Sequence, residues 1–171
     1  MAIDRTIDSK DVEILAIIQS NGRISNAEIA RQVNMAPSGV LERLRKLELR
    51  GVLKGYEARL DPHALGVGLL AFVFVRVEER VGSMGAGKLM AEIPEVQEVH
   101  HVAGEDCYLA KVRCADPEDL GRVLRDRFGA IPAVRSTRST IVLGTVKESA
   151  ILPLPAVPSD DLVREPEVTL A

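Results

Sequence analysis

The chain of 171 residues contains no tryptophan and few other aromatic residues, with three phenylalanines and two tyrosines. Proteins that bind single-stranded nucleic acid by stacking bases on aromatic side chains need more of them, so the sequence disfavours that class. Cysteine is also scarce, because Cys107 and Cys114 are the only two and are too few for a disulfide framework. We therefore expect reduced thiols and a cytoplasmic location.

The sequence also lacks any hydrophobic run of the roughly 18 to 20 residues that a membrane span requires. The N-terminal stretch MAIDRTIDSKD is polar and mixed in charge, unlike a signal peptide. Hydrophobic residues make up 46% of the chain and charged residues 27%, as in ordinary globular domains. These features predict no membrane partner and one or two small domains with modest cores.

Charge is distributed unevenly along the chain. Residues 1–59 hold ten Lys/Arg and eight Asp/Glu, a net charge of +2, whereas residues 60–171 hold twelve and seventeen, a net charge of −5. Within residues 23–59 the balance is eight basic to four acidic residues. A locally basic segment on an acidic remainder favours local contact with phosphates over general binding of polyanions.

Helix start and stop signals are concentrated in this first part of the chain. The first predicted helix begins after Asp8, a good N-cap, has Asp11 in its first turn, and ends near Gly22. The second predicted helix follows a capping box made by Ser25 and Glu28. A four-residue connection, Val-Asn-Met-Ala, then leads to a third helix.

The third predicted helix begins at Pro37, which suits the first helical position, and ends before Gly51. Its apolar periodicity predicts a buried stripe of Val40, Leu41, Leu44 and Leu47. At about 100° per residue, the opposite face is centred on Ser38, Gly39, Glu42, Arg45 and Lys46, with Arg43 and Arg50 at its edges. This helix therefore has one apolar face and one polar, mostly basic face.

The stretch VLKGYEARLD, which follows Gly51, is predicted to form a β-hairpin around the turn Lys54-Gly55. Three helices followed by a hairpin make a winged helix-turn-helix, whose third helix enters the major groove. Its small N-terminal residues can approach base edges, while Arg45, Lys46 and Lys54 can contact phosphates. A basic face that is merely solvated, or a winged helix that binds only protein, remains an alternative.

The second half of the chain predicts a separate domain. The predicted boundaries are residues 4–60 for the DNA-binding domain, 61–67 for a linker and 68–148 for the second domain. The stretch GLLAFVFVRVE predicts a strand with two apolar faces. The remaining patterns predict a helix over 83–92, strands over 96–103 and 108–114, a helix over 116–128 and a strand over 135–146. This β-α-β-β-α-β order is the ferredoxin-like unit, so the whole chain is expected to be α+β.

Both helices of that unit cover the same face of the sheet, which leaves the second apolar face of the first strand uncovered. A second subunit is the simplest cover, so we predict a homodimer through this domain. Two symmetric helix-turn-helix units would fit a pseudo-palindromic DNA site. Residues 149–171 contain four prolines and no periodicity, which predicts a flexible tail.

Motifs for metal binding or catalysis are lacking. The pairs Cys107/Cys114 and His100/His101 would each point to opposite sides of a regular strand, and none has a zinc-like CxxC spacing. The sequence has no Gly-rich phosphate loop, nucleophile elbow or HExxH motif. We therefore predict no metal, no cofactor, no catalytic residues and no enzymatic activity.

Two stretches resemble a known family. ISNAEIARQVNMAPSGVLERLRKLELRGVLKGY followed by DPHALG resembles the DNA-binding half of the Lrp/AsnC (feast/famine) transcription regulators. VHHVAGEDCYLAKVRC and VRSTRSTIVLGTVKES resemble the regulatory half. The resemblance covers residues 4–149. It implies a helix-turn-helix over residues 26–47, assembly of dimers into octamers, and a DNA contact set of Ser38, Gly39, Arg43, Arg45 and Lys46.

The resemblance also implies that a small amino acid binds between dimers, near the loop Gly104, Glu105, Asp106, Cys107 and Tyr108. Many family members have an aromatic residue where Asp106 stands and an aspartate where Cys107 stands. In this chain, backbone N–H groups at Gly104 could bind a carboxylate and Asp106 or Glu105 an ammonium group. The expected function is a regulator that senses an amino acid at a subunit interface and responds through its assembly.

Two other functions stay open on the sequence. Some proteins that resemble Lrp/AsnC regulators are haem-precursor decarboxylases with a degenerate helix-turn-helix, so an enzyme is one alternative. A protein-interaction module with an idle winged helix is the other. DNA binding that weakens steeply with salt would separate the regulator from both.

Overall fold

The structure is a computed structural model and describes residues 7–80, 83–104 and 106–154. The chain forms two compact units. The first unit is Met1–Ala58 together with Glu148–Ala171, and the second is Arg59–Lys147. The chain therefore leaves the first unit once and returns to it after the second is complete.

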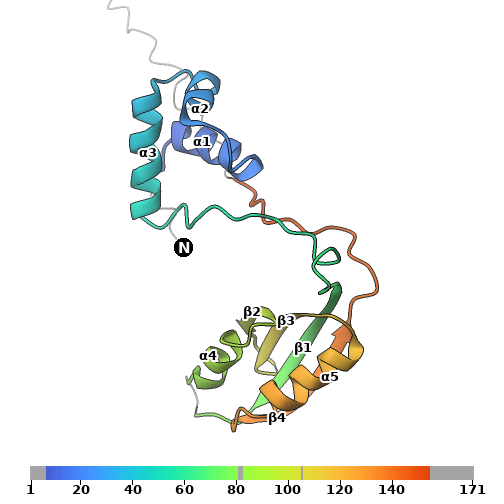
Figure 1. The fold of residues 1–171 in the computed structure, drawn as a ribbon. Helices are drawn as coiled ribbons and strands as arrows, with labels where there is room; N and C mark the ends of the chain where they lie inside the picture. The colour runs from blue at the N-terminus through green and yellow to red at the C-terminus, as the bar shows by residue number, and fades with distance from the viewer. Residues whose placement is uncertain (1–6, 81–82, 105, 155–171) are drawn as a thin grey trace, which may run out of the picture. The chain divides into compact units, whose positions relative to one another are not determined.

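The described part of the first unit contains helices α1 (Ser9–Ser20), α2 (Asn26–Gln32) and α3 (Pro37–Leu49) (Figure 1). The predicted N-caps Asp8 and Ser25 are confirmed, because Asp8 and Asp11 form a reciprocal capping box and Ser25 Oγ accepts from the Glu28 N–H group. The Glu28 half of the second predicted capping box is wrong, since the Glu28 carboxylate bonds Arg31 and Gln32 instead. Asn34 lies in the four-residue turn before α3 with φ 53°, a left-handed conformation that asparagine tolerates well.

One face of each helix contributes to the core of the first unit. The buried residues of this core are Ile14, Ile18, Ile29, Ala30, Val33, Val40 and Leu44. Leu41, which the periodicity placed in the buried stripe, is 38% exposed. The reason is angular, because Leu41 lies about 100° around the helix from Val40, whereas Leu44 and Leu47 lie within about 40° of it.

The predicted wing hairpin is wrong, because residues 50–68 contain no strand. The N–H groups of Val52 and Leu53 both donate to the carbonyl oxygen of Leu47, at 2.9 and 3.1 Å. These groups close the end of α3 and are not available for a strand ladder. Tyr56 also binds this segment to the end of α3, since its hydroxyl group donates to Glu48 at 3.1 Å.

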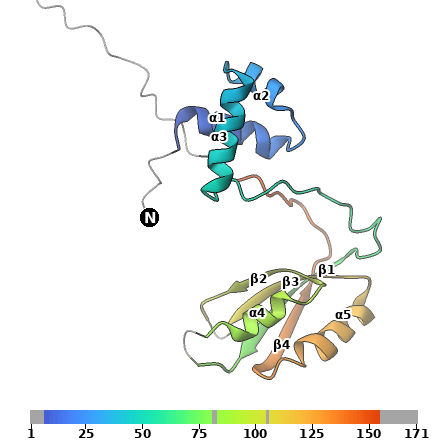
Figure 2. The same cartoon turned by 60° about the vertical axis from the view of Figure 1, so that its left-hand side comes forward.

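The second unit is a four-stranded antiparallel sheet in the order β2-β3-β1-β4. Figures 1 and 2 show its two helices on the same face of the sheet. The β-α-β-β-α-β order and the α+β class are therefore confirmed. The elements are β1 (Leu69–Val77), α4 (Gly85–Ala91), β2 (Val96–His101), β3 (Tyr108–Cys114), α5 (Pro117–Val123), a π-helical turn (Leu124–Phe128) and β4 (Val134–Ile141).

Strand β4 ends five residues earlier than the sequence suggested. Its last paired residue, Ile141, lies opposite Ala71, and β1 begins only two residues before that position. The Val142 N–H group still donates to Leu70, after which β1 offers no further partner. The length of the neighbouring strand therefore decides where β4 ends.

The two faces of the sheet differ in burial. Alternate residues of β1 and β3 point toward the helices and are buried: Ala71, Val73, Val75, Tyr108, Ala110, Val112 and Cys114. On the outer face, Phe72 and Phe74 of β1 remain only partly buried. Both helices in the described part of the second unit, α4 and α5, lie on the inner face, so the outer face keeps apolar surface.

The segment after residue 147 is attached to α1. The side-chain amide of Gln19 accepts a hydrogen bond from the Leu152 N–H group and donates one to the Leu152 carbonyl oxygen, both at 3.1 Å. Residues 155–171 of the predicted flexible tail lie outside the described residues. The described part of that tail is therefore bound to the first unit by the two hydrogen bonds between Leu152 and Gln19.

The contact between Gly87 and Tyr108 provides a test of the second core. A Cβ atom on Gly87 would lie 2.7 Å from Tyr108 Cε1, and Tyr108 is 1% exposed. We expect Gly87→Ala to lower the free energy of unfolding by about 1–3 kcal/mol through overpacking. Urea denaturation followed by circular dichroism measures this change.

The matched control is Gly121→Ala in α5, where a Cβ atom would meet nothing within 4 Å. This substitution should raise the free energy of unfolding by about 0.5–1 kcal/mol, since alanine favours helix. Equal effects of the two substitutions would contradict the close packing of α4 on Tyr108.

Candidate nucleic-acid interface and effector loop

Helix α3 exposes a polar face opposite its buried residues. Ser38, Glu42, Arg45 and Lys46 are exposed, and Gly39 is partly exposed. The N-cap residue, Ala36, has no side-chain acceptor for the N–H groups of the first turn. Pro37 has no N–H group and the Gly39 N–H group donates to Ala36, so Ser38 is left as the backbone donor beside these small side chains.

The basic residues on this face are weakly engaged within the protein. Lys46 Nζ lies 2.7 Å from Glu42 Oε1 one turn away, and both side chains are about two-thirds exposed. Exposed pairs of this kind add little stability, so a phosphate can replace Glu42 at little cost. Arg45 is exposed on the same face, and Lys54 is exposed just beyond the end of α3.

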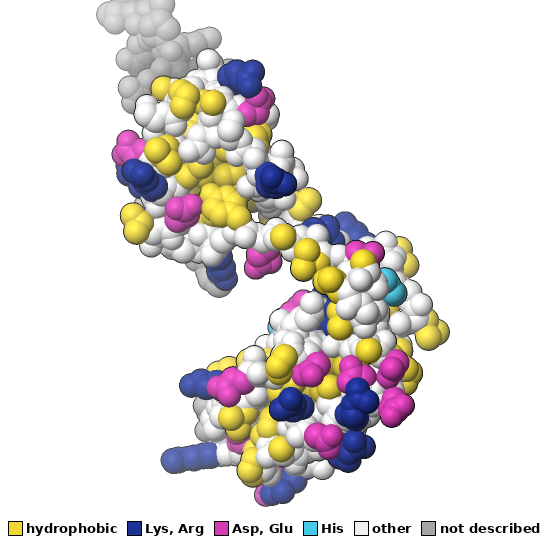
Figure 3. All heavy atoms as spheres, in the orientation of Figure 1, with side chains coloured by type: hydrophobic (Ala, Val, Ile, Leu, Met, Phe, Trp, Pro, Cys, Tyr) yellow, Lys and Arg dark blue, Asp and Glu magenta, His cyan; other side chains and the backbone are white. Residues whose placement is uncertain are grey.

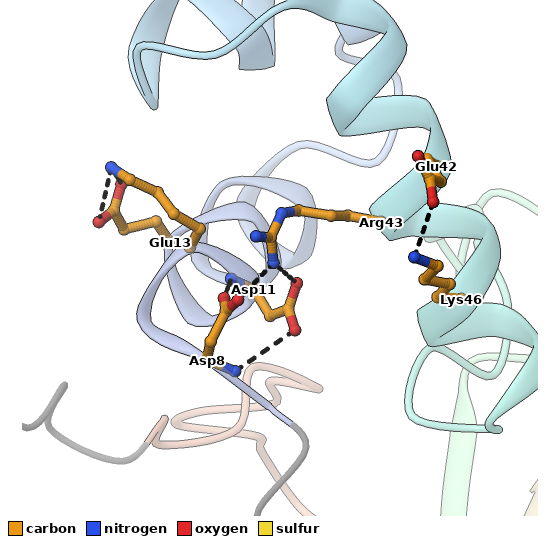
Figure 4. Close-up of polar contacts among 7 residues, drawn as sticks. Asp8, Asp11, Glu13, Glu42, Arg43 and Lys46 are labelled. Carbon is orange, nitrogen blue, oxygen red and sulfur yellow. Dashed lines mark hydrogen bonds and ion pairs between the residues drawn. The ribbon is translucent and has the colours of Figure 1, made fainter.

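Arg43 differs from these cations because it reaches α1. Its Nη1 atom donates to Asp8 Oδ2 at 2.6 Å and to Asp11 Oδ1 at 2.8 Å. Figure 4 shows the Arg43 side chain extending to the start of α1, while Glu42 and Lys46 pair elsewhere on α3. The hydrogen bonds to Asp11 and then to Asp8 raise the pKa of Arg43.

The same cluster changes the ionisation of Asp8. Burial by itself would raise the pKa of Asp8, but the hydrogen bonds from the Asp11 N–H group and from Arg43 lower it below the ordinary value. The contacts with Asp11 and Arg43 thus favour the charged form of the Asp8 carboxylate. The sequence indicated Asp8 as the N-cap and Asp11 as a negative charge in the first turn, but it gave no signal that they would also bind Arg43.

The predicted effector loop connects β2 and β3. Gly104 has φ 136°, a left-handed conformation that favours glycine, and Glu105 lies outside the described residues. The Val102 N–H group donates to the Cys107 carbonyl oxygen at 3.0 Å, which closes the hairpin. Cys107 Sγ in turn lies 3.7 Å from the Val77 carbonyl oxygen of β1.

Asp106 is tied to the outer face of the sheet. Its Oδ2 atom accepts from Arg138 Nη2 of β4 at 2.8 Å, and the Arg138 guanidinium lies 4.1 Å from the centre of the Phe74 ring. Arg138 is therefore a residue of this site that sequence reasoning missed. It stands 32 positions from Asp106, and only the pairing of β4 with β1 brings it near the loop.

Tyr108 points away from the rest of the predicted effector set. Its ring is buried against Gly87, and its centre lies 5.1 Å from that of His101. Burial raises the pKa of its hydroxyl group. Tyr108 therefore anchors the end of the loop in the core, and the described surface of the loop is formed by Gly104, Asp106 and Cys107.

Three other kinds of site find no support in the described structure: a second basic face, a metal centre and a membrane span. Residues 117–128 carry three basic and three acidic side chains, which Figure 3 shows interleaved over α5, so this face has no excess positive charge. Over the ranges that the structure describes, no group of three or more His, Cys, Asp or Glu residues could hold a metal ion. No helix in those ranges is long and apolar enough to span a bilayer.

Comparison with known proteins follows this division into two units. Residues 7–54 match the family described as winged helix-turn-helix DNA-binding, and residues 70–152 match the Lrp/AsnC ligand binding domain. The HTH-type transcriptional regulator FL11 of Pyrococcus horikoshii is 38% identical over 148 residues, which cover 86% of this chain and 97% of that protein. The chain belongs to the Lrp/AsnC family.

Further relatives support this family membership and confirm the predicted resemblance. The leucine-responsive regulatory protein of Escherichia coli is 35% identical over 147 residues, covering 85% of the present Lrp/AsnC chain and 90% of that protein. A feast or famine regulatory protein from M. tuberculosis, solved in complex with L-methionine, is 34% identical, has a TM-score of 0.78, and is matched over 89% of this chain and 99% of that one.

A transcriptional regulator from Neisseria meningitidis, also solved with L-methionine, is 31% identical with a TM-score of 0.77. The match covers 86% of this Lrp/AsnC chain and 97% of that regulator. The agreement extends over both units, so the helix-turn-helix and the sheet domain occur together in the relatives as they do here.

The two thiols of this Lrp/AsnC chain differ in exposure, which allows a test of the loop structure. Cys114 is buried, and its burial raises the pKa to about 11, whereas Cys107 is partly exposed. We expect one fast-reacting thiol when the folded protein is treated with a thiol reagent at pH 8, because the reagent attacks accessible thiolate. Cys107→Ser should remove the fast reaction, and the matched variant Cys114→Ser should retain it. Comparable rates for the two thiols would contradict the burial of Cys114.

Proposed function

We propose that this protein is a transcription regulator that reads double-stranded DNA by placing α3 in the major groove. The observation that carries the proposal is the exposed polar face of α3, with small residues at its N-terminal end and cations further along. Ser38 and Gly39 approach base edges, while Arg45, Lys46 and Lys54 contact phosphates. Arg43 is left out of this contact set because Asp8 and Asp11 hold its guanidinium.

We further propose that the loop at residues 104–108 binds a small amino acid. Asp106 and Arg138 form an exposed pair of opposite charges, which matches the ammonium and carboxylate groups of a zwitterion. Gly104 leaves its backbone accessible, Cys107 lines the loop, and Glu105 belongs to the predicted set although it lies outside the described residues. Two structural relatives bind L-methionine, a ligand of this chemical class.

The proposed effector site borders the proposed dimer interface. Phe72 and Phe74 keep apolar surface on the outer face of the sheet, and a second copy of the chain would cover it. Arg138 contacts Phe74 and Asp106 together, so an amino acid that binds Arg138 also changes the edge of this face. Effector binding would thereby alter assembly, from dimer toward octamer, and so the engagement of a pseudo-palindromic operator.

The rival functions are an enzyme related to the haem-precursor decarboxylases and an interaction module with an idle helix-turn-helix. The named relatives are transcription regulators, which favours the regulator over both. Specific DNA binding with a steep salt dependence is the property that neither rival would require. A gel-shift titration at two salt concentrations, with and without amino acids, therefore tests the proposal directly.

Lys46→Ala tests the phosphate contacts of α3. Lys46 lies on the exposed face and would release about one counterion on binding DNA. We expect this substitution to weaken binding to all sequences and to reduce the slope of log affinity against log salt by about 1. Lys88→Ala, an equal charge change on α4, should leave the slope unchanged. An unchanged slope in Lys46→Ala would remove Lys46 from the phosphate contacts.

Arg138→Gln and Asp106→Asn test the effector site by the chemistry of the ligand. We expect Arg138→Gln to weaken binding of an amino acid but not of its amide, which lacks the carboxylate. Asp106→Asn should weaken binding of both, because both keep the ammonium group. Isothermal titration with L-methionine and its amide measures these affinities. Unaltered L-methionine binding in Asp106→Asn would show that the ammonium assignment is wrong.

A further inference from the structure

Arg43 lies in the middle of α3 but not on the face proposed to read DNA. At about 100° per residue, its direction is about 40° from that of buried Leu47, whereas Arg45 is about 160° from Leu47. The Arg43 side chain is less than one-third exposed and ends between two carboxylates of α1. Position and contacts therefore agree that Arg43 faces the protein.

The carboxylate of Asp11 requires this guanidinium. Asp11 is 6% exposed and is the only charged residue in the buried set of the described chain. Its Oδ1 atom accepts from Arg43, and its Oδ2 atom accepts from the Asp8 N–H group at 3.4 Å. A carboxylate removed from water is tolerated only when it is paired and hydrogen-bonded. Arg43 thus neutralises and hydrogen-bonds the buried carboxylate of Asp11.

The charge of the cluster also disfavours a phosphate contact. Asp8 and Asp11 contribute two negative charges and Arg43 one positive charge, so the cluster carries a net charge of −1 at neutral pH. A phosphate placed beside it would meet net repulsion. Lys46, in contrast, shares its charge with a single exposed carboxylate.

The cluster fixes α3 in a way that its apolar contacts do not. Val40 and Leu44 pack α3 into the small core, and apolar packing of this kind has little directional preference. The hydrogen bonds of Arg43 are short and directional, and their acceptors are the N-cap and third residues of α1, which bind each other through the capping box. Arg43 therefore connects the middle of α3 to a well-fixed helix end.

From these contacts we infer that Arg43 is a positioning residue for DNA reading, which sets the orientation of α3 against α1 without touching DNA. This inference rests on the proposed function and assigns Arg43 a role within it. Ser38 and Gly39 then meet base edges only while Arg43 stays bound to Asp8 and Asp11, whereas the long side chains of Arg45 and Lys46 keep their phosphates through a small rotation of α3.

Asp11→Asn is the sharpest variant, because electrostatics and positioning predict opposite results. Removal of a negative charge near DNA by itself strengthens binding, and so does release of Arg43 toward a phosphate. Positioning predicts instead an affinity about tenfold lower, equal to about 1.4 kcal/mol, with an unchanged salt slope. The full-length chain is titrated at several salt concentrations on a duplex that the unsubstituted protein selects from a random pool.

Glu42→Gln is the matched control, since it removes an equal charge from the exposed pair with Lys46. Its affinity for the duplex should equal or exceed that of the unsubstituted protein. Arg43→Lys is the second variant, because it keeps the charge, but its shorter side chain ends one atom short of Nη1, which bonds both carboxylates. Its affinity should fall with an unchanged slope, and urea denaturation verifies that each variant is folded.

The outcomes separate this inference from the proposed function. Stronger binding by Asp11→Asn, or full affinity in Arg43→Lys, would overturn the positioning role and leave DNA reading intact. A third variant, Arg43→Met, removes the charge of Arg43. A salt slope reduced by about 1 in this variant would show that Arg43 contacts a phosphate, and would also overturn the positioning role. If the unsubstituted chain selects no specific duplex, the proposed function fails, and the inference fails with it.

Discussion

The burial of one carboxylate, that of Asp11, constrains the arrangement of the first unit. A core of seven buried residues can hold three short helices together, but apolar contacts alone leave their mutual rotation loosely defined. The buried ion pair between Asp11 and Arg43 adds direction to this small core. Buried ion pairs often contribute more to the definition of one arrangement than to net stability, and an orientation-sensitive reading helix needs that definition.

A second arginine, Arg138, joins two elements of the sheet unit in a more exposed setting. It bonds Asp106 of the loop and stacks on Phe74 of β1, yet its side chain is 63% exposed, about twice the exposure of Arg43. Exposed pairs are weak and exchange partners readily. The two arginines thus differ in what they can do, since the half-buried Arg43 holds a fixed geometry and the exposed Arg138 can yield its partner to a ligand.

The segment after α3 does not form the predicted hairpin, because its backbone N–H groups bond the end of the helix. The N–H groups of Val52 and Leu53 close α3, and Tyr56 bonds Glu48, so the segment after α3 is attached to helix ends instead of pairing with itself. Lys54 is exposed in this segment without a strand to fix its direction. The phosphate contact proposed for Lys54 therefore depends on how firmly the neighbouring residues bind the end of α3.

Local signals in the sequence were sufficient for the helices of the first unit and for the order of the sheet unit, but not for the segment after α3. Asp8 and Ser25 start their helices by accepting from the N–H group three positions on, and Pro37 starts α3 by occupying its first position. The two-residue period of β1 defines both faces of its strand. The polar face of α3, with Ser38, Arg45 and Lys46, follows from helical geometry alone. The family was also recognisable from its two motifs.

Partners distant in the sequence were decided only by the tertiary structure. In the sequence, Arg43 looked like one more cation on a basic helix. Asp11, its buried partner, precedes it by 32 positions, and no local pattern shows that the two side chains meet. Arg138 reaches Asp106 only because β4 pairs with β1, and Tyr108 leaves the loop surface because Gly87 makes room for its ring. The pattern of a segment determines its own conformation, whereas the charge state and role of a side chain depend on which segments fold against it.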